Sequence, residues 1–208
     1  GTLLKGTPQR KIVEYLNNSD KTHSLEIRNL PDHIKVHITN PKPAPGETGE
    51  IQVSYFSDKQ DDWDFIIDRL NIYIDGETDR ANRLIVSANI QEDFSSLSAE
   101  ERANAAHASF DNKTFDFEKI TQGDKVSHEY LLTNTGKSDL VIRKVRASCG
   151  CTAVVMDNKI INPGEKTGIK VTFNSAGKLG KQNKTVTVIT NDPDKPREIL
   201  WIRGEIVK

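Results

Sequence analysis

The sequence has little cysteine, few aromatic residues and no long apolar run. Its only cysteines are Cys149 and Cys151 among 208 residues, too few for a scaffold held together by many disulfides. No stretch approaches the roughly 20 apolar residues that cross a bilayer, and no basic-then-apolar leader stands at the start. We therefore expect no membrane span in this fragment.

An excess of charge of one sign is also lacking. Lysine and arginine number 29 against 30 aspartate and glutamate, which gives a formal net charge of -1. With so small a net charge, the chain has no overall positive electrostatic field to attract nucleic acid or an anionic membrane. We therefore expect no nucleic-acid partner. Gly-x-Ser-x-Gly and a phosphate-cradling glycine-rich loop are missing too. The sequence predicts no enzyme, no catalytic residues, no cofactor and no metal site.

What the chain does have is a series of short segments in which apolar residues alternate with polar ones. A period of two is typical of β-strands, and turn residues separate the segments. The expected strands are residues 11–16, 25–28, 34–38, 51–55, 70–74 and 84–90, then 114–117, 128–133, 140–145, 152–156, 169–173, 185–190 and 198–206. Seven short strands at this spacing favour an immunoglobulin-like sandwich.

The two halves align with each other at an offset of about 116 to 118 residues. Four motif pairs carry the alignment: Gly6 with Gly123, Asn18-Ser19-Asp20-Lys21 with Asn134-Thr135-Gly136-Lys137, Pro45-Gly46-Glu47 with Pro163-Gly164-Glu165, and Ile85-Val86 with Trp201-Ile202. A steady offset over separate motifs indicates two copies of one domain. In this alignment Val171, Phe173 and Ile202 face one core, and Val53, Tyr55 and Val86 face the other.

The fold class expected is therefore all-β, with two tandem immunoglobulin-like β-sandwich domains joined by a short helical linker. The boundaries are 1–94 for the first domain, 95–108 for the linker and 109–208 for the second domain. A capping box at Ser98 and Glu101 starts the linker helix.

Gly1 aligns with Glu118, so the strand at 114–117 has no counterpart and the first domain lacks its first strand. We expect that open edge to pair with another chain or with the linker, including by self-association through strands.

The motifs of the second half resemble the bacterial family of domains of unknown function 1573. In chain order they are Phe115-Asp116-Phe117, Gly123, residues 134–142, Ser148-Cys149-Gly150-Cys151-Thr152 and Pro163-Gly164-Glu165. Asn191-Asp192-Pro193-Asp194 is similar to ciliary-type and major-sperm-protein-like immunoglobulin folds. The first half resembles the same plan as a divergent copy, with residues 30–35 in place of the cysteine signature. The resemblance implies a β-sandwich of periplasmic or extracellular location with no established catalytic activity.

Other candidate residues have a structural interpretation beside a functional one. His33 and His37 could share a face of a strand and bind metal, but a solvated face is the commoner role of such a pair. The acidic segment 58–64 lacks the features of a calcium loop, so an exposed hairpin tip is favoured. Trp63 is a candidate surface binding residue, whereas alternation favours core positions for Phe65 and Trp201.

Cys149-Gly150-Cys151 is the sharpest chemical feature. Side chains two residues apart on a strand share a face, with Cα atoms about 6.6 Å apart, at the edge of disulfide reach. Three interpretations stay open: a tight disulfide, a two-thiolate metal site that needs further ligands, and two inert buried thiols. We expect the pair to be structural and not a reactive centre, since its face of the strand is mostly apolar.

The leading hypothesis for function is a non-catalytic cell-envelope module that binds or holds an unidentified macromolecule of the envelope. The first alternative is a thiol-based redox or metal-handling protein that uses Cys149 and Cys151. A weaker alternative is a glycan-binding accessory domain, which needs exposed aromatic residues in a row. A fold by itself does not choose among them.

Overall fold

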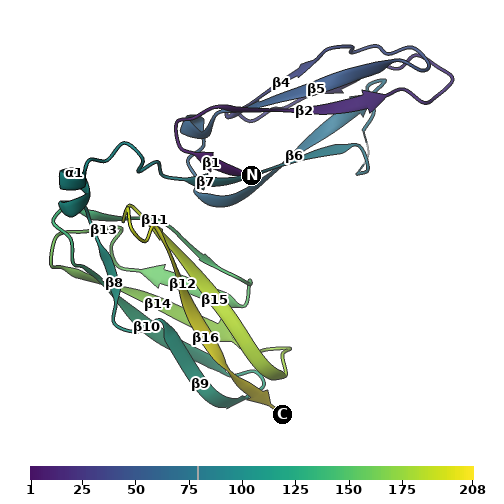
Figure 1. The fold of residues 1–208 in the computed structure, drawn as a ribbon. Helices are drawn as coiled ribbons and strands as arrows, with labels where there is room; N and C mark the ends of the chain where they lie inside the picture. Colours follow the sequence, from purple (N-terminus) through teal and green to yellow (C-terminus); the bar gives the residue numbers. More distant parts are fainter. Residues whose placement is uncertain (79) are drawn as a thin grey trace. The chain divides into compact units, whose positions relative to one another are not determined.

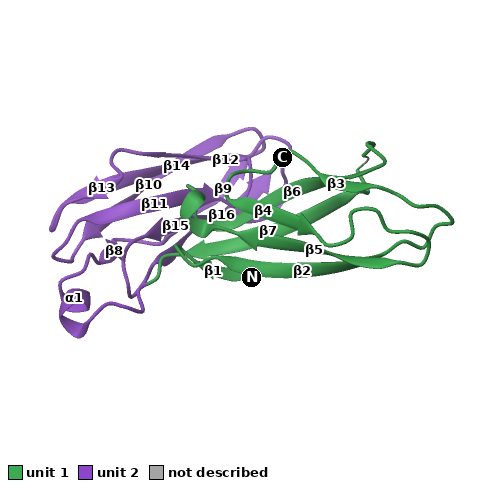
Figure 2. Ribbon diagram, turned by 90° about the horizontal axis from the view of Figure 1, so that it is seen from above, with its two compact units in different colours: residues 1–93 green, residues 94–208 purple. Residues whose placement is uncertain are grey.

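The computed structural model describes residues 1–78 and 80–208, and the chain forms two compact units, Gly1–Asp93 and Phe94–Lys208 (Figure 2). Nearly all of the regular structure is β-strand, as the alternating pattern predicts, and each unit contains two sheets (Figure 1). None of the helices among the described residues has the length and apolar character needed to cross a membrane.

The first unit packs a four-stranded sheet against a three-stranded one. The larger sheet has the order β1 (Thr2–Leu4), β7 (Arg83–Gln91), β6 (Asp64–Ile74), β3 (Leu25–Ile27). The smaller sheet has the order β2 (Gln9–Leu16), β5 (Thr48–Tyr55), β4 (Ile34–Ile38), and the 3-10 turn η1 (Ser57–Lys59) follows β5. All neighbouring strands are antiparallel except β1, which runs parallel to β7.

The second unit has the same two layers with additional strands. One sheet has the order β12 (Thr152–Met156), β14 (Lys166–Asn174), β10 (Lys125–Asn134), β8 (Ala108–Phe110). The other has the order β13 (Ile160–Ile161), β11 (Leu140–Ala147), β15 (Gly180–Thr190), β16 (Arg197–Val207), β9 (Thr114–Thr121). Here β9 is the strand parallel to its neighbour β16, in the position that β1 has beside β7.

The six side chains that the alignment of the halves places in the cores lie there or pack against them. Val171, Phe173 and Ile202 are buried in the second core, and Val53 and Tyr55 are buried in the first. Val86 packs against the first core but stays half-buried. Two expectations were wrong: Trp201 is 39% exposed and Phe65 is 46% exposed. Alternation identifies which residues share a face of a strand, but it does not decide which face the second sheet covers.

Matched turns support the alignment of the halves and correct its register at one point. Asn17 and Asn134 are buried, and each donates its side-chain amide to two backbone carbonyls at 2.7–2.8 Å. Asn17 is therefore the counterpart of Asn134, and the expected match of Asn18 was wrong by one residue. Gly46 and Gly164, both at φ 79, follow prolines in turns that glycine accommodates at positive φ.

The short helix α1 (Ala99–Ala103) begins at Ser98 with the expected capping box. The segment expected as a linker is grouped with the second unit, since Ala106 and Ala108 are buried in its core.

The acidic segment 58–64 is not wholly an exposed tip, because it begins in η1 and ends at the buried Asp64, which adopts φ 63. Three short strands, β1, β8 and β13, have two or three residues each and were not predicted.

Candidate binding site at the open edges of the first unit

In the second unit, residues 108–117 form a closing segment that joins the edges of both sheets. Its first part, β8, pairs antiparallel with β10, with Ala108 opposite Asn134 and Phe110 opposite Leu132. The chain then crosses to the other sheet, where β9 pairs parallel with β16, starting with Thr114 opposite Trp201. One continuous segment therefore covers two sheet edges.

Two aromatic side chains of the closing segment fill the space between the sheets. The Phe115 ring stacks on His128 at 4.5 Å, and the Phe117 ring lies 5.6 Å from that of Phe173. Phe117 also lies over the backbone of Gly204, where an added Cβ would be 2.3 Å from its Cδ2 atom. Glycine at this position is thus required by the ring above it.

Tyr130 on β10 lies next to these rings and is fully buried. Its ring is edge-on to His128, and its hydroxyl donates to the Trp201 carbonyl at 2.7 Å. Burial raises the pKa of Tyr130 to about 12, because the phenolate would lose its hydration. The closing segment therefore completes a dry core that includes a hydrogen bond between the two sheets.

In the first unit, β1 corresponds to the end of such a segment. β1 pairs Thr2 with Asn89 and Leu3 with Ile90, as the last residues of β9 pair Lys119 with Glu205 and Ile120 with Ile206. In the described part of the chain, residues 85–87 of β7 have a strand neighbour on one side only, which is β6. Likewise β2 has only β5 as a neighbour. Both sheets therefore have an open edge at the place that residues 108–117 cover in the second unit.

The open edges border a cavity of about 220 Å³, which we call the open groove. Its lining includes Val13, Val53, Tyr55, Leu84, Val86 and Ala88. Val13 is 41% exposed, whereas its counterpart Tyr130 is 0% exposed. Leu84 and Val86 are half-buried, whereas their counterparts Leu200 and Ile202 are buried. The first unit thus leaves apolar side chains in contact with water that the second unit covers.

The backbone of the open β7 edge has donors directed to the side on which β1 pairs. Asn89 donates its N–H to the Gly1 carbonyl at 2.9 Å, so its N–H lies on the β1 side. Amide directions alternate along a strand, so the N–H groups of Ser87 and Ile85 are directed to the same side. The equivalent donor in the second unit, Trp201, binds the Lys113 carbonyl at 2.7 Å. The edge therefore has the pattern needed to accept a parallel strand.

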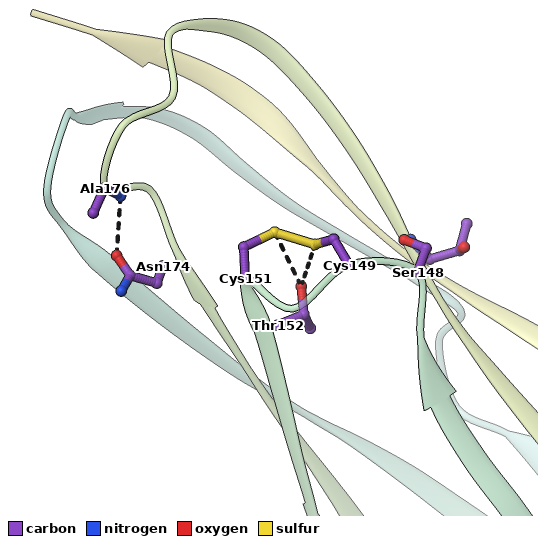
Figure 3. The surroundings of a disulfide bond; sticks show 7 residues. Ser148, Cys149, Cys151, Thr152, Asn174 and Ala176 are labelled. Atoms are coloured by element: carbon purple, nitrogen blue, oxygen red, sulfur yellow. Dashed lines mark hydrogen bonds between the residues drawn. A yellow bond between two sulfur atoms is a disulfide. The ribbon is translucent and has the colours of Figure 1, made fainter. Parts of the chain in front are cut away.

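Cys149 and Cys151 lie between β11 and β12 and form a disulfide, with Cα atoms 5.3 Å apart (Figure 3). This is the first of the three interpretations that the sequence left open. The Thr152 hydroxyl lies 3.4 Å from the Cys149 sulfur and 4.0 Å from the Cys151 sulfur. Cys151 packs against the second core. A site that binds metal through both sulfurs would first require reduction of this bond.

The remaining candidate residues have structural partners. Trp63 is half-buried against the first core, with the Lys5 ammonium 4.9 Å from its ring centroid, so it does not present the open face that a sugar platform needs. His33 and His37 do not form an exposed pair, because His33 is buried and lies 3.1 Å from a carboxylate oxygen of Asp68. The expectation of a solvated pair was therefore wrong.

A group that sequence reasoning missed is His107, Asp192 and Asp194, which alone among the described residues could hold a metal ion. The His107 Nδ1 atom lies 3.4 Å from Asp192 and 3.8 Å from Asp194. Asp192 is buried, and its carboxylate accepts backbone N–H groups of Ala108, Asp194 and Lys195. Asp192 thereby attaches the start of β8 to the loop before β16.

Comparisons with known proteins agree with this fold. The model of a family described as protein of unknown function (DUF1573) matches residues 108–206, so the match begins at the closing segment. A protein of unknown function from Porphyromonas gingivalis W83 has a TM-score of 0.65 and 16% identity, over 95% of this chain and 91% of that one. PapD-like domain 7 of human CEP192 has a TM-score of 0.41 and 11% identity, over 49% of this chain and 85% of that one. The search of curated proteins finds no match.

Proposed function

We propose that the chain is a non-catalytic module of the bacterial cell envelope whose first unit binds an extended polypeptide segment. The observation that carries the proposal is the pair of open edges on β7 and β2 beside the open groove. The second unit supports it, because residues 108–117 of the same chain occupy the corresponding position there.

Binding by strand addition follows from the chemistry of these edges. An added strand gains main-chain hydrogen bonds from the edge, and its alternate side chains enter the space between the sheets. An uncovered edge is also a site of unwanted pairing, so a protein benefits from keeping it covered. The open groove would supply specificity, since its apolar lining selects the side chains that point inward.

The envelope location is supported by the disulfide between Cys149 and Cys151. Disulfides form and persist in oxidising compartments and are rare in the reducing cytosol. In cells acid-quenched and then treated with a thiol-alkylating reagent, we expect the chain to take no label before reduction and two labels after it. A chain labelled twice without reduction would contradict the envelope location, and a Cys149→Ser, Cys151→Ser variant controls for non-specific label.

Binding at the β7 edge can be tested with a displayed library of random peptides. We expect enriched peptides to bind the chain and to lose about tenfold in affinity when Ile85→Pro removes an edge N–H and obstructs the approaching strand. Ile85 is 64% exposed, and a proline is tolerated where the N–H is directed away from the ladder. The fold of the variant should therefore persist.

Ile85→Ala is the matched control, because it removes the same side chain but keeps the N–H group. Circular dichroism of all three proteins checks that the fold is intact. The proposal fails if no peptide is enriched, or if the enriched peptides bind the chain, Ile85→Ala and Ile85→Pro with equal affinity.

A further inference from the structure

We infer that the disulfide between Cys149 and Cys151 is a thiol–disulfide exchange site that accepts two electrons from a dithiol, with the Thr152 hydroxyl stabilising the thiolate that is released. The inference goes beyond the proposed function, since the site lies in the second unit and its test does not involve the open groove. It follows from the place of the bridge in the fold, the small loop that it closes and the contact with Thr152.

The two cysteines lie in a turn and not on a strand. β11 ends at Ala147 and β12 begins at Thr152, so the unbroken strand with an apolar face, on which the expectation of a structural pair depended, is not formed. Both cysteines are half-buried, and Gly150 between them is exposed. A Cβ added at Gly150 would meet no atom within 4 Å. The turn therefore leaves space beside the bridge for an approaching thiolate.

The bridge closes a very small loop, with a single residue between its cysteines. The entropy that a disulfide removes from the unfolded chain grows with the size of the closed loop, so this bridge stabilises the fold less than one that joins distant strands. By thermodynamic linkage, the fold protects a disulfide from reduction only as far as the disulfide stabilises the fold. A bridge of this kind is labile and exchanges with thiols.

The backbone on both sides of the bridge is held by hydrogen bonds to other segments. Ser148 donates its N–H to the Thr185 carbonyl at 2.8 Å, and its hydroxyl accepts the Thr185 N–H at 3.0 Å. On the other side, the Cys151 carbonyl accepts the Asn174 N–H at 2.9 Å. None of these hydrogen bonds involves the sulfur atoms. We therefore expect the two sulfurs to stay close together after reduction, so that the bridge can form again.

Thr152 places a hydroxyl beside the sulfurs. The residue is buried, and its hydroxyl oxygen lies 3.4 Å from the Cys149 sulfur and 4.0 Å from the Cys151 sulfur. A neutral sulfur is a weak acceptor, whereas a thiolate accepts a charge-assisted hydrogen bond. The hydroxyl therefore makes a stronger hydrogen bond once the bridge opens. The shorter distance assigns Cys149 as the sulfur that leaves as a thiolate.

The exchange proceeds in two steps. One thiolate of the dithiol attacks the Cys151 sulfur, a mixed disulfide forms, and the electron pair of the broken bond goes to Cys149. The second thiolate of the dithiol then attacks its own partner sulfur and expels the Cys151 thiolate. The dithiol is oxidised to a disulfide, and the two cysteines take up the two protons that its thiols release to water. A single thiol lacks the second step, because the nearby Cys149 attacks the mixed disulfide again and expels it.

Reduction of the folded chain by dithiothreitol, followed by alkylation and mass measurement, tests the exchange site. We expect a rate proportional to the dithiothreitol concentration that changes less than about twofold in urea below the unfolding transition, since the fold does not have to open. Glutathione at equal thiol concentration should react at least about tenfold more slowly, because it lacks the second thiol. A rate that rises more than about tenfold in the same urea would overturn the exchange site. Equal rates with both reductants would overturn the preference for a dithiol.

Thr152→Val tests the hydroxyl, because valine has a similar shape and no donor. In mixtures of oxidised and reduced dithiothreitol, we expect the equilibrium constant for reduction to fall about tenfold in Thr152→Val and to return to within about threefold in Thr152→Ser. A merely structural role would lower stability without moving this constant. Fluorescence of Trp201 in a Trp63→Phe background checks that the second unit stays folded. Equal constants for the unmodified chain and Thr152→Val would overturn the role of the hydroxyl.

Discussion

Replacing Phe117 by alanine is expected to lower the free energy of unfolding of the second unit by about 3–5 kcal/mol. The Phe117 ring is 8% exposed, stacks with Phe173 and lies over Gly204. Its loss leaves a cavity between the sheets that the backbone around Gly204 cannot fill. The variant would therefore give the second unit an opening that resembles the open groove of the first unit.

The chain offers a convenient readout for this experiment. It has two tryptophans, Trp63 in the first unit and Trp201 in the second. In a Trp63→Phe background, fluorescence during denaturant unfolding reports the second unit alone. Phe65→Ala, read in a Trp201→Phe background, is the control, because Phe65 is 46% exposed and should cost less than about 1 kcal/mol. A loss below about 1 kcal/mol for Phe117→Ala would show that the closing segment does not support the core.

The strands were predictable because their signal is local. Alternation located thirteen of the sixteen strands of the described residues, and their observed bounds extend the expected ones by a few residues at most sites. Six core residues could be named because the two halves share motifs at a steady offset, whereas Phe65 and Trp201, expected in the cores from alternation alone, are exposed. The three strands that were missed have two or three residues each, and so short a run shows a period of two only weakly.

The candidate site depended on information that is not local. The alignment of the halves indicated an open edge, because residues 114–117 have no counterpart in the first half. It did not show that β8 closes the other sheet, because that pairing depends on where residues 108–110 lie in space. The exposure of Trp201 and the burial of His33 were missed for a related reason, since sheet packing and the contact with Asp68 decide them.

Adding a closing segment to the same chain should stabilise the first unit strongly. Residues 108–117, with Phe117→Val to accommodate Ala88, can be added directly before Gly1, because Gly1 aligns with Glu118. Glu118 adopts φ 57, a conformation that glycine enters without strain. The added strand would cover Val13 and Val86 and pair with both open edges. We expect the unfolding temperature of the first unit to rise by about 8 °C, which corresponds to roughly 1–2 kcal/mol.

The matched control is the same extension carrying Phe115→Ser and Phe117→Ser, which can pair its backbone but has no apolar side chains to bury. Following Trp63 fluorescence on heating, in a Trp201→Phe background, tests most directly that the open groove is a site for an extended segment. The account predicts a rise of about 8 °C for the apolar extension, little change for the serine control, and, for the chain with the apolar extension, loss of binding to the peptides that the unextended chain enriches from the random library. Equal unfolding temperatures for both extensions, with peptide binding retained, would contradict it.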